Sequence, residues 1–167
     1  MAAILTTELQ LQALAEHGDT FTFDTFTAAD AWELGHCLYA RLLPDPRPVL
    51  ISITLATGVT VFQMSTGSRV GPDNEVWVER KRRSALRWGC SSWLMNLKFA
   101  GDMCAFAAKY GLSPDQASGY AIHGGAVPIR VRGVEGVVAV VVVSGLAQAE
   151  DHGVIVDVVK ENWEPAG

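Results

Sequence analysis

The sequence predicts an α+β domain in which helices cover both faces of a single antiparallel sheet. Two hairpin patterns are flanked by helical patterns at both ends and in the middle of the chain. The clearest strand is the apolar run Val137–Val143, which is rich in β-branched residues and bounded by Gly136 and by Ser144-Gly145. Such a run predicts a strand buried on both faces at the centre of the sheet. We expect about five strands in one domain spanning residues 1–167.

Composition and charge limit the classes of partner. Hydrophobic residues make up 49% of the 167 and charged residues only 19%, which is a high apolar share for a soluble monomer of this size. We therefore expect other copies of the chain to cover part of the apolar surface in a homo-oligomer. The formal net charge of −5 argues against nucleic acid as a partner, because neutralising phosphates needs a basic face.

The cysteines and the first residues bear on the cellular compartment. Cys37, Cys90 and Cys104 are widely spaced in apolar contexts without a CxxC motif, which predicts buried thiols in a reducing compartment. Glu8 and Glu16 lie where a signal peptide is apolar, and the valine run is too short to span a bilayer. We expect a cytoplasmic protein with no membrane association.

The first elements follow from periodicity and caps. Thr7–His17 has leucines near helical spacing and ends at Gly18, which predicts an amphipathic helix. Phe21 and Phe23 alternate with polar residues, as in a short strand with one buried face. Thr27–Asp30 resembles a capping box. The helix that it begins should end before Pro44 and should bury one face, made of Ala31, Leu34, Gly35, Leu38 and Leu42.

A change to period two predicts the first hairpin. Apolar residues alternate from Val49 to Leu55, the chain turns at Gly58, and alternation resumes from Val59 to Ser65. We expect both faces of this hairpin to be largely covered. A polar loop follows and ends at Pro72.

A single long helix is predicted from Pro72 to Phe99. Proline suits its first turn, and its first half carries charges, whereas the half from Trp88 onward is almost wholly apolar. A helix that is apolar all round must be buried all round. We expect a second subunit to supply the cover, and Gly101 to end or kink the helix.

The remaining elements are bounded by residues that typically begin or end helices and strands. Asp102–Tyr110 is a helix capped by Gly111, and Ser113–Gln116 is a cap with a short helical turn. Pro128–Arg132 forms a hairpin with the valine run and should keep one face in water. Ala147–Trp163 closes the chain as an amphipathic helix that carries on one face Val154, Ile155, Val158, Val159 and Asn162.

The usual motifs of nucleotide, zinc and nucleophile-elbow chemistry are absent. His17 and His36 have no partner at metal-ligand spacing, so no metal site is predicted. The segment His123-Gly124-Gly125 is the first candidate site. Its glycines permit close approach to a ligand, and its imidazole could act as acid, base or metal ligand. The alternative is that the glycines only turn the chain and His123 bonds a neighbouring carbonyl.

A second candidate lies where the valine strand ends and the last helix begins. Backbone N–H groups near Ser144 and Gly145 could hold an anion there. Asp151 and His152 are adjacent on a helix and so point about 100° apart, which excludes a catalytic dyad. Asp151 either offsets the helix dipole or contributes to a pocket, and the sequence leaves both interpretations open.

A third candidate is Lys81. Trp77, Lys81, Ala85 and Trp88 lie on one stripe of the long helix, which places an ammonium beside aromatic surface where it could meet an anionic ligand. The surrounding basic run, Arg80–Arg83, covers every side of one turn. We interpret that run as a solvated face paired with nearby glutamates.

Three segments together resemble a known family. GGAVPI at 124–129, RGVEGVVAVVVVSGL at 132–146 and EDH at 150–152 resemble the haem-binding or haem-degrading-domain family, the HbpS/GlcG-like proteins. The resemblance covers about residues 5–163. Within that family, the chain is most similar to a branch of uncharacterised bacterial and fungal proteins.

The resemblance implies a profilin-like domain with α/β/α layers, homo-oligomeric assembly and a pocket that takes haem. Among the candidate ligand-binding residues, it implies Lys81, Gly124, Gly125, Pro128, Ser144, Gly145 and Asp151. His123 and His152 are added as candidates, and neither is assigned to iron.

The leading hypothesis is a homo-oligomeric protein that binds a small anionic planar molecule such as haem, without demonstrated catalysis. Two alternatives stay open. One is a protein-interaction scaffold, and the other is an enzyme that uses His123 as acid or base.

Overall fold

Within residues 19–163, five strands form one sheet in the order β1-β4-β5-β2-β3. The computed structural model describes residues 19–163, so the helix predicted at Thr7–His17 lies outside the described residues. The strands are β1 (Phe21–Phe23), β2 (Leu50–Leu55), β3 (Thr60–Ser65), β4 (Ala126–Val131) and β5 (Ala139–Ser144). Every residue of β5 is buried. The prediction of a central strand covered on both faces is therefore confirmed.

The strand register shows one departure from the prediction. β5 runs antiparallel to β2, with Val143 opposite Ile51, and antiparallel to β4. β1 instead pairs in parallel with β4, with Phe21 opposite Ile129, so the sheet is mixed at that edge. Hairpin signals predict only pairs of neighbouring strands, and β1 and β4 are separated by most of the chain.

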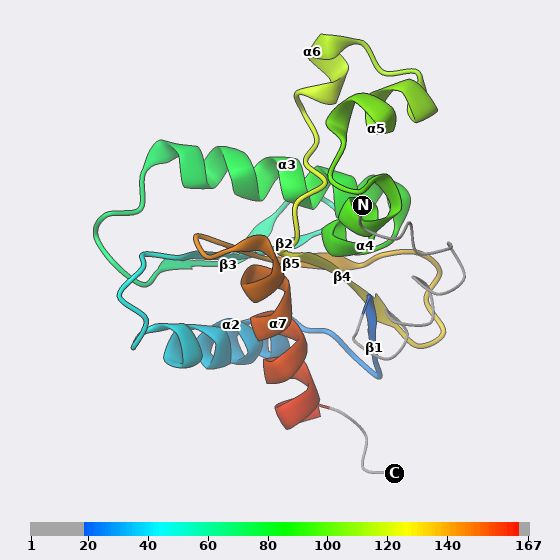
Figure 1. Ribbon diagram of the computed structural model, residues 1–167. Helices are drawn as coiled ribbons and strands as arrows, with labels where there is room; N and C mark the ends of the chain where they lie inside the picture. The colour runs from blue at the N-terminus through cyan, green and yellow to red at the C-terminus, as the bar shows by residue number, and fades with distance from the viewer. Residues whose placement is uncertain (1–18, 164–167) are drawn as a thin grey trace.

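Helices cover both faces of the sheet, as predicted (Figure 1). On one face lie α2 (Ala28–Leu42) and α7 (Gln148–Trp163). On the other lies α3 (Pro72–Trp88), followed by α4 (Ser92–Phe99). Beyond α4 the short helices α5 (Met103–Tyr110) and α6 (Pro114–Ala117) extend away from the sheet. No described helix has the length and apolar character needed to cross a membrane.

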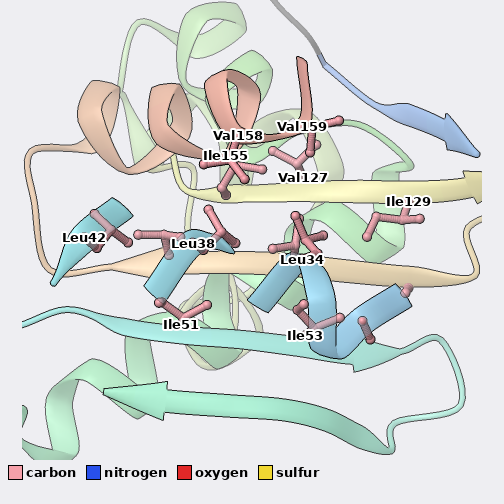
Figure 2. Packing of buried hydrophobic residues seen from close by; sticks show 14 of the residues in the cluster. Leu34, Leu38, Leu42, Ile51, Ile53, Val127, Ile129, Ile155, Val158 and Val159 are labelled. Carbon is pink, nitrogen blue, oxygen red and sulfur yellow. The ribbon is translucent and has the colours of Figure 1, made fainter. Parts of the chain in front are cut away.

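The main core fills the space between the sheet and α2 with α7 (Figure 2). Leu34 and Leu38 of α2 and Ile155 of α7 pack against Ile51 and Val127 of the sheet. Alternate residues of β5 join this core, whereas the intervening Val140 and Val142 pack on the α3 side. Because successive strand side chains point to opposite faces, this division explains why β5 is apolar at every position.

Local caps begin the helices where the sequence predicts. Thr27 Oγ1 accepts a hydrogen bond from Asp30 N at 3.2 Å, and Thr27 N donates to Asp30 Oδ2 at 2.7 Å. This capping box satisfies donors that the first helical turn leaves unpaired. The buried residues of α2 are those predicted, namely Ala31, Leu34, Gly35, Leu38 and Leu42. Ser113 begins α6 with a capping box of the same kind, and the Asp102 side chain caps α5 by accepting hydrogen bonds from Cys104 N and Ala105 N.

The single long helix predicted from Pro72 to Phe99 is wrong. α3 ends at Trp88, because Gly89 adopts the left-handed conformation with φ of 65°, and Ser91 begins α4 by accepting a hydrogen bond from Leu94 N. The break turns the apolar segment back on the same chain. Its cover includes Phe106 and Ile122. The argument that this segment needs a second subunit is thereby lost.

Three smaller expectations also need correction. The face of β4 that was expected to be exposed to solvent is covered. Pro128 is buried, and the half-buried Arg130 donates through Nη2 to the carbonyl oxygen of Gly89 at 3.1 Å. β3 is an edge strand with an exposed Met64 rather than a covered strand. Cys104 is exposed, whereas Cys90 is buried as predicted.

Candidate functional site

A cleft of about 330 Å³ lies where α3, the end of β5 and the start of α7 meet. This volume is within the range of roughly 300 to 1,000 Å³ that small-molecule pockets occupy. Its lining residues are Asn74, Trp77, Lys81, His123, Ser144, Gly145, Leu146, Gln148 and Asp151.

A buried ion pair connects the two helices of the cleft. Lys81 Nζ lies 3.1 Å from Asp151 Oδ2, and the side chains are only 5% and 2% exposed. Lys81 also donates to the carbonyl oxygen of Val143 at 3.4 Å, and Leu146 N donates to Asp151 Oδ1 at 2.9 Å. The pair therefore joins α3 on one face of the sheet to α7 on the other, across the end of β5.

Burial shifts the protonation of both partners. Desolvation lowers the pKa of Lys81 and raises the pKa of Asp151, and the attraction between the two charges opposes each shift only in part. Burial disfavours the charged form of any group. The pair is therefore easier to neutralise, by transfer of a proton from Lys81 to Asp151, than the same pair in water.

Two glycines allow the loop before β4 to approach its neighbours. Gly125 has φ of +131°, and a Cβ there would lie 2.4 Å from the Val143 oxygen and 2.8 Å from Lys81 Nζ. A Cβ at Gly124 would lie 2.5 Å from the carbonyl oxygen of Gln148. Gly124 N also donates to Gln148 Oε1 at 3.1 Å. Side chains larger than hydrogen would therefore push this loop out of place.

α3 fixes the other side of the same loop. Arg80 Nε donates to the carbonyl oxygen of Tyr120 at 3.1 Å. Ala121 N donates to Ser84 Oγ, also at 3.1 Å. These contacts, with those of the glycines, hold His123 between α3 and α7.

His123 presents an imidazole to the cleft. Its ring lies edge-on to Trp77, with 4.9 Å between the ring centroids. Its Nδ1 atom is buried without a hydrogen-bond partner among the described residues. Burial, and then the positive charges of Lys81 and Arg80, lower the pKa of His123. The ring is therefore neutral at pH 7, the state in which histidine binds metals or accepts a proton.

The structure brings together five of the nine candidate residues in the lining of the cleft, namely Lys81, His123, Ser144, Gly145 and Asp151. Gly124 and Gly125 lie behind the lining and shape the loop. Pro128 is a buried residue of β4. His152 is buried against Trp93, with 6.2 Å between ring centroids, and is not part of the lining.

Four lining residues were not among the candidates: Asn74, Trp77, Leu146 and Gln148. Trp77 carried a signal, because it shares a helical stripe with Lys81. Asn74 lies in the charged first half of the predicted long helix, and no motif or spacing in the sequence indicates that it lines a pocket. Its Nδ2 atom donates to the carbonyl oxygen of Ser144 at 3.5 Å, a contact that only the fold creates.

Metal ligands do not cluster here. Within residues 19–163, no group of three or more His, Cys, Asp or Glu side chains is placed to hold a metal ion.

Comparison with known proteins gives a consistent result. A family model described as haem degrading protein HbpS-like matches residues 26–160. A UPF0303 protein of Streptomyces avermitilis is 39% identical over 140 residues, covering 84% of this chain and 82% of the relative. A UPF0303 protein of Streptomyces coelicolor is 40% identical over 144 residues, covering 86% and 87%.

Solved structures extend the similarity to the fold. The crystal structure of the Ybr137w protein matches with a TM-score of 0.79 and 31% identity, covering 92% of this chain and 90% of that one. A double mutant of HbpS from Streptomyces reticuli gives a TM-score of 0.62 at 18% identity, covering 84% and 88%. A haem complex of PduOC also gives 0.62, at 13% identity, covering 81% and 94%. The last two identities are low enough that only the fold is compared.

Proposed function

The chain belongs to the HbpS-like family of haem degrading proteins, and from this membership we propose that its cleft binds a planar ligand, with haem as the ligand that the comparisons favour. One observation carries the proposal: the neutral imidazole of His123 lines a cleft of about 330 Å³ and has a buried nitrogen without a hydrogen-bond partner among the described residues. One of the solved structures with a similar fold, that of PduOC, is a complex with haem. That likeness supports the choice of ligand to be tested first.

The residues of the cleft fit haem in their chemistry. Imidazole is a preferred ligand of haem iron, and His123 is the only histidine of the lining. Trp77 offers an aromatic wall beside it. His123 would hold the iron and Trp77 would pack against the macrocycle, and the bound haem would supply redox chemistry at its iron.

The carboxylates of haem need a cation other than Lys81. Asp151 already matches the charge of Lys81, so this pair adds no net positive charge to the cleft. Arg80 is outside the lining but near it, with its guanidinium carbon 4.7 Å from the centre of the Trp77 ring, and no carboxylate is paired with it in the described structure. We therefore assign Arg80 rather than Lys81 to the anionic edge of the ligand.

Haemin titration tests the proposal. Wild-type protein should give a saturable shift of the Soret band, and His123→Ala should weaken the affinity by tenfold or more, as loss of an axial ligand requires. His36→Ala is the matched control, because His36 is an exposed histidine stacked on Trp32 of α2. It should bind haemin like the wild type.

Two results would contradict the proposal. The absence of any saturable change with the wild type would remove haem as the ligand. Equal affinities for His123→Ala and His36→Ala would remove His123 from the site, even if haemin binds.

We also propose that the chain assembles with copies of itself. β3 is an edge strand, and an open edge is a ready site for pairing with another chain. Large apolar side chains are exposed on β3 and elsewhere, including Trp32 at 59%, Val59 at 58% and Met64 at 46%. Surfaces of this kind are typical of subunit interfaces.

A further inference from the structure

Lys81 differs from every other lysine of the chain. The sequence has four lysines, of which Lys98 and Lys109 are exposed, Lys160 is half-buried and Lys81 is buried. Lys81 alone lines the cleft, beside a buried carboxylate at 3.1 Å. A buried lysine with an adjacent proton acceptor is the arrangement that lysine nucleophiles use.

We propose that Lys81 forms a Schiff base with a small neutral aldehyde or ketone that enters the cleft. Lys81 is among the lining residues of the cleft, and 5% of its side chain is exposed. Burial lowers the pKa of Lys81, which favours the uncharged amine that such a reaction needs. This inference goes beyond haem binding and uses Lys81 and Asp151 rather than His123.

The chemistry balances within the site. Asp151 accepts one proton from the Lys81 ammonium, which leaves a neutral amine. Nζ then bonds to the carbonyl carbon, and the former carbonyl oxygen takes a proton from that nitrogen to give a carbinolamine. Asp151 returns its proton to this hydroxyl, the C–O bond breaks, and water leaves as the C=N bond forms. The products are a protonated imine and the Asp151 carboxylate, with no oxidant or reductant required.

The lining indicates the class of carbonyl compound. Lys81 and Asp151 are its only ionised side chains at neutral pH, since His123 is neutral, and their charges cancel. Asn74, Ser144 and Gln148 supply neutral polar groups. A small hydroxyaldehyde matches the groups around Lys81, because its hydroxyl can pair with them and it brings no further charge beside the buried ion pair.

Site-resolved trapping tests the proposal on the intact wild-type protein. The protein is incubated briefly with glycolaldehyde at neutral pH, reduced with borohydride and analysed by peptide mass spectrometry. We expect the reduced adduct at Lys81 to exceed that at Lys98 or Lys109 several-fold, because burial lowers the pKa of Lys81 and so raises its fraction of neutral amine.

Variants then separate chemistry from general reactivity. Lys98→Met, the matched control on α4, should leave the Lys81 adduct unchanged. Lys81→Met should lose the adduct of the cleft and keep those at the surface. The wild-type measurement decides even if Lys81→Met does not fold, because equal adducts at all lysines, or an unmodified Lys81, would overturn the proposal.

The two proposals fail separately. Haemin binding is followed by the Soret band, whereas imine formation is followed by the mass of the Lys81 peptide. If no Soret shift is seen, the mass of the Lys81 peptide still tests imine formation. If no adduct forms at Lys81, the Soret band still tests haemin binding.

Discussion

The ion pair between Lys81 and Asp151 is held where little water reaches it, with side chains only 5% and 2% exposed. Two buried charges stabilise a fold only when each keeps its partner, because removing one leaves the other without compensation. Both the stability and the proposed chemistry of the cleft depend on this pair.

Removing one partner should therefore destabilise the protein strongly. We expect Lys81→Met to lower the free energy of unfolding by about 3 to 5 kcal/mol. The double variant Lys81→Met with Asp151→Leu should recover most of this loss, because it removes both charges. Urea unfolding measures both, with Lys98→Met as the control at an exposed lysine. A single variant as stable as that control would contradict this account of the pair.

The sequence predicted both members of this pair as site residues but not their contact. Lys81 was marked by its aromatic stripe and Asp151 by its place in the first turn of a helix. They are 70 residues apart and come from helices on opposite faces of the sheet. No local pattern carries that information. His152 shows the converse, since adjacency to Asp151 in sequence does not bring it into the cleft.

At the scale of the elements, α2 packs closely on the sheet because it has a glycine in its buried face. A Cβ at Gly35 would lie 2.4 Å from Cγ of Phe62 on β3. Gly35→Ala should therefore lower the free energy of unfolding by about 1 to 3 kcal/mol through overpacking, although alanine is the better helix former.

A matched glycine gives the opposite expectation. Gly153 lies inside α7, and no described atom beyond its neighbours and the nearby backbone of its own helix lies within 4 Å of the position that a Cβ would take there. Gly153→Ala should therefore raise the free energy of unfolding by about 0.5 to 1 kcal/mol. Thermal or urea unfolding compares the two variants. Stabilisation by both substitutions would show that the contact of α2 with Phe62 is looser than described.

α3 also carries an ion-pair cluster with a defined pH dependence. The hydrogen bond from Arg82, reinforced by Arg83, lowers the pKa of Glu79 below its usual 4.5. A carboxylate with a lowered folded pKa stabilises the fold above the unfolded value, and this contribution is lost as pH falls through the folded value.

Glu79→Gln should therefore destabilise the protein at pH 7 and not at low pH. The side chain of Glu79 is 42% exposed, so solvent screening limits the effect at pH 7 to about 0.5 to 1 kcal/mol. Urea unfolding at pH 7 and at stepwise lower pH measures the difference. Glu75→Gln, one turn earlier, is the control, and an effect of Glu79→Gln that grows in acid would exclude this mechanism.

The starts of four helices, α2, α3, α5 and α6, were predicted from the sequence, whereas the end of α3 and the start of α4 were not. Each of these four helices begins at a residue whose side chain caps the first turn or whose proline ring suits it, and these effects act within four residues of the chain. The residues are Thr27, Pro72, Asp102 and Ser113. The end of α3 was missed, because Gly89 lies inside a continuous apolar pattern. Glycine followed two residues later by serine was the available signal, since these types suit a helix end and a helix start.

At the scale of the whole molecule, the predicted α+β class, the five strands and the two covered faces are confirmed within residues 19–163. The parallel β1 was not predictable from hairpin signals, and the cover of the Trp88–Phe99 segment by its own chain depended on the turn at Gly89. Both depend on contacts between distant segments, to which periodicity is insensitive.

Assembly is a prediction at this scale. The exposed apolar side chains and the open edge of β3 lead us to expect a particle of at least two 17.9 kDa chains. Light scattering coupled to size-exclusion chromatography measures this mass. A mass of one chain at micromolar concentration would rule out the stable homo-oligomer.

The central claim is that the cleft between α3 and α7 is a binding site served by His123. A crystal structure of the protein grown with haemin tests it most directly. We predict haem in this cleft with its iron bonded to a nitrogen of His123 and its ring beside Trp77. Haem bound elsewhere on the chain, or held in the cleft by another iron ligand with His123 turned away, would contradict the claim.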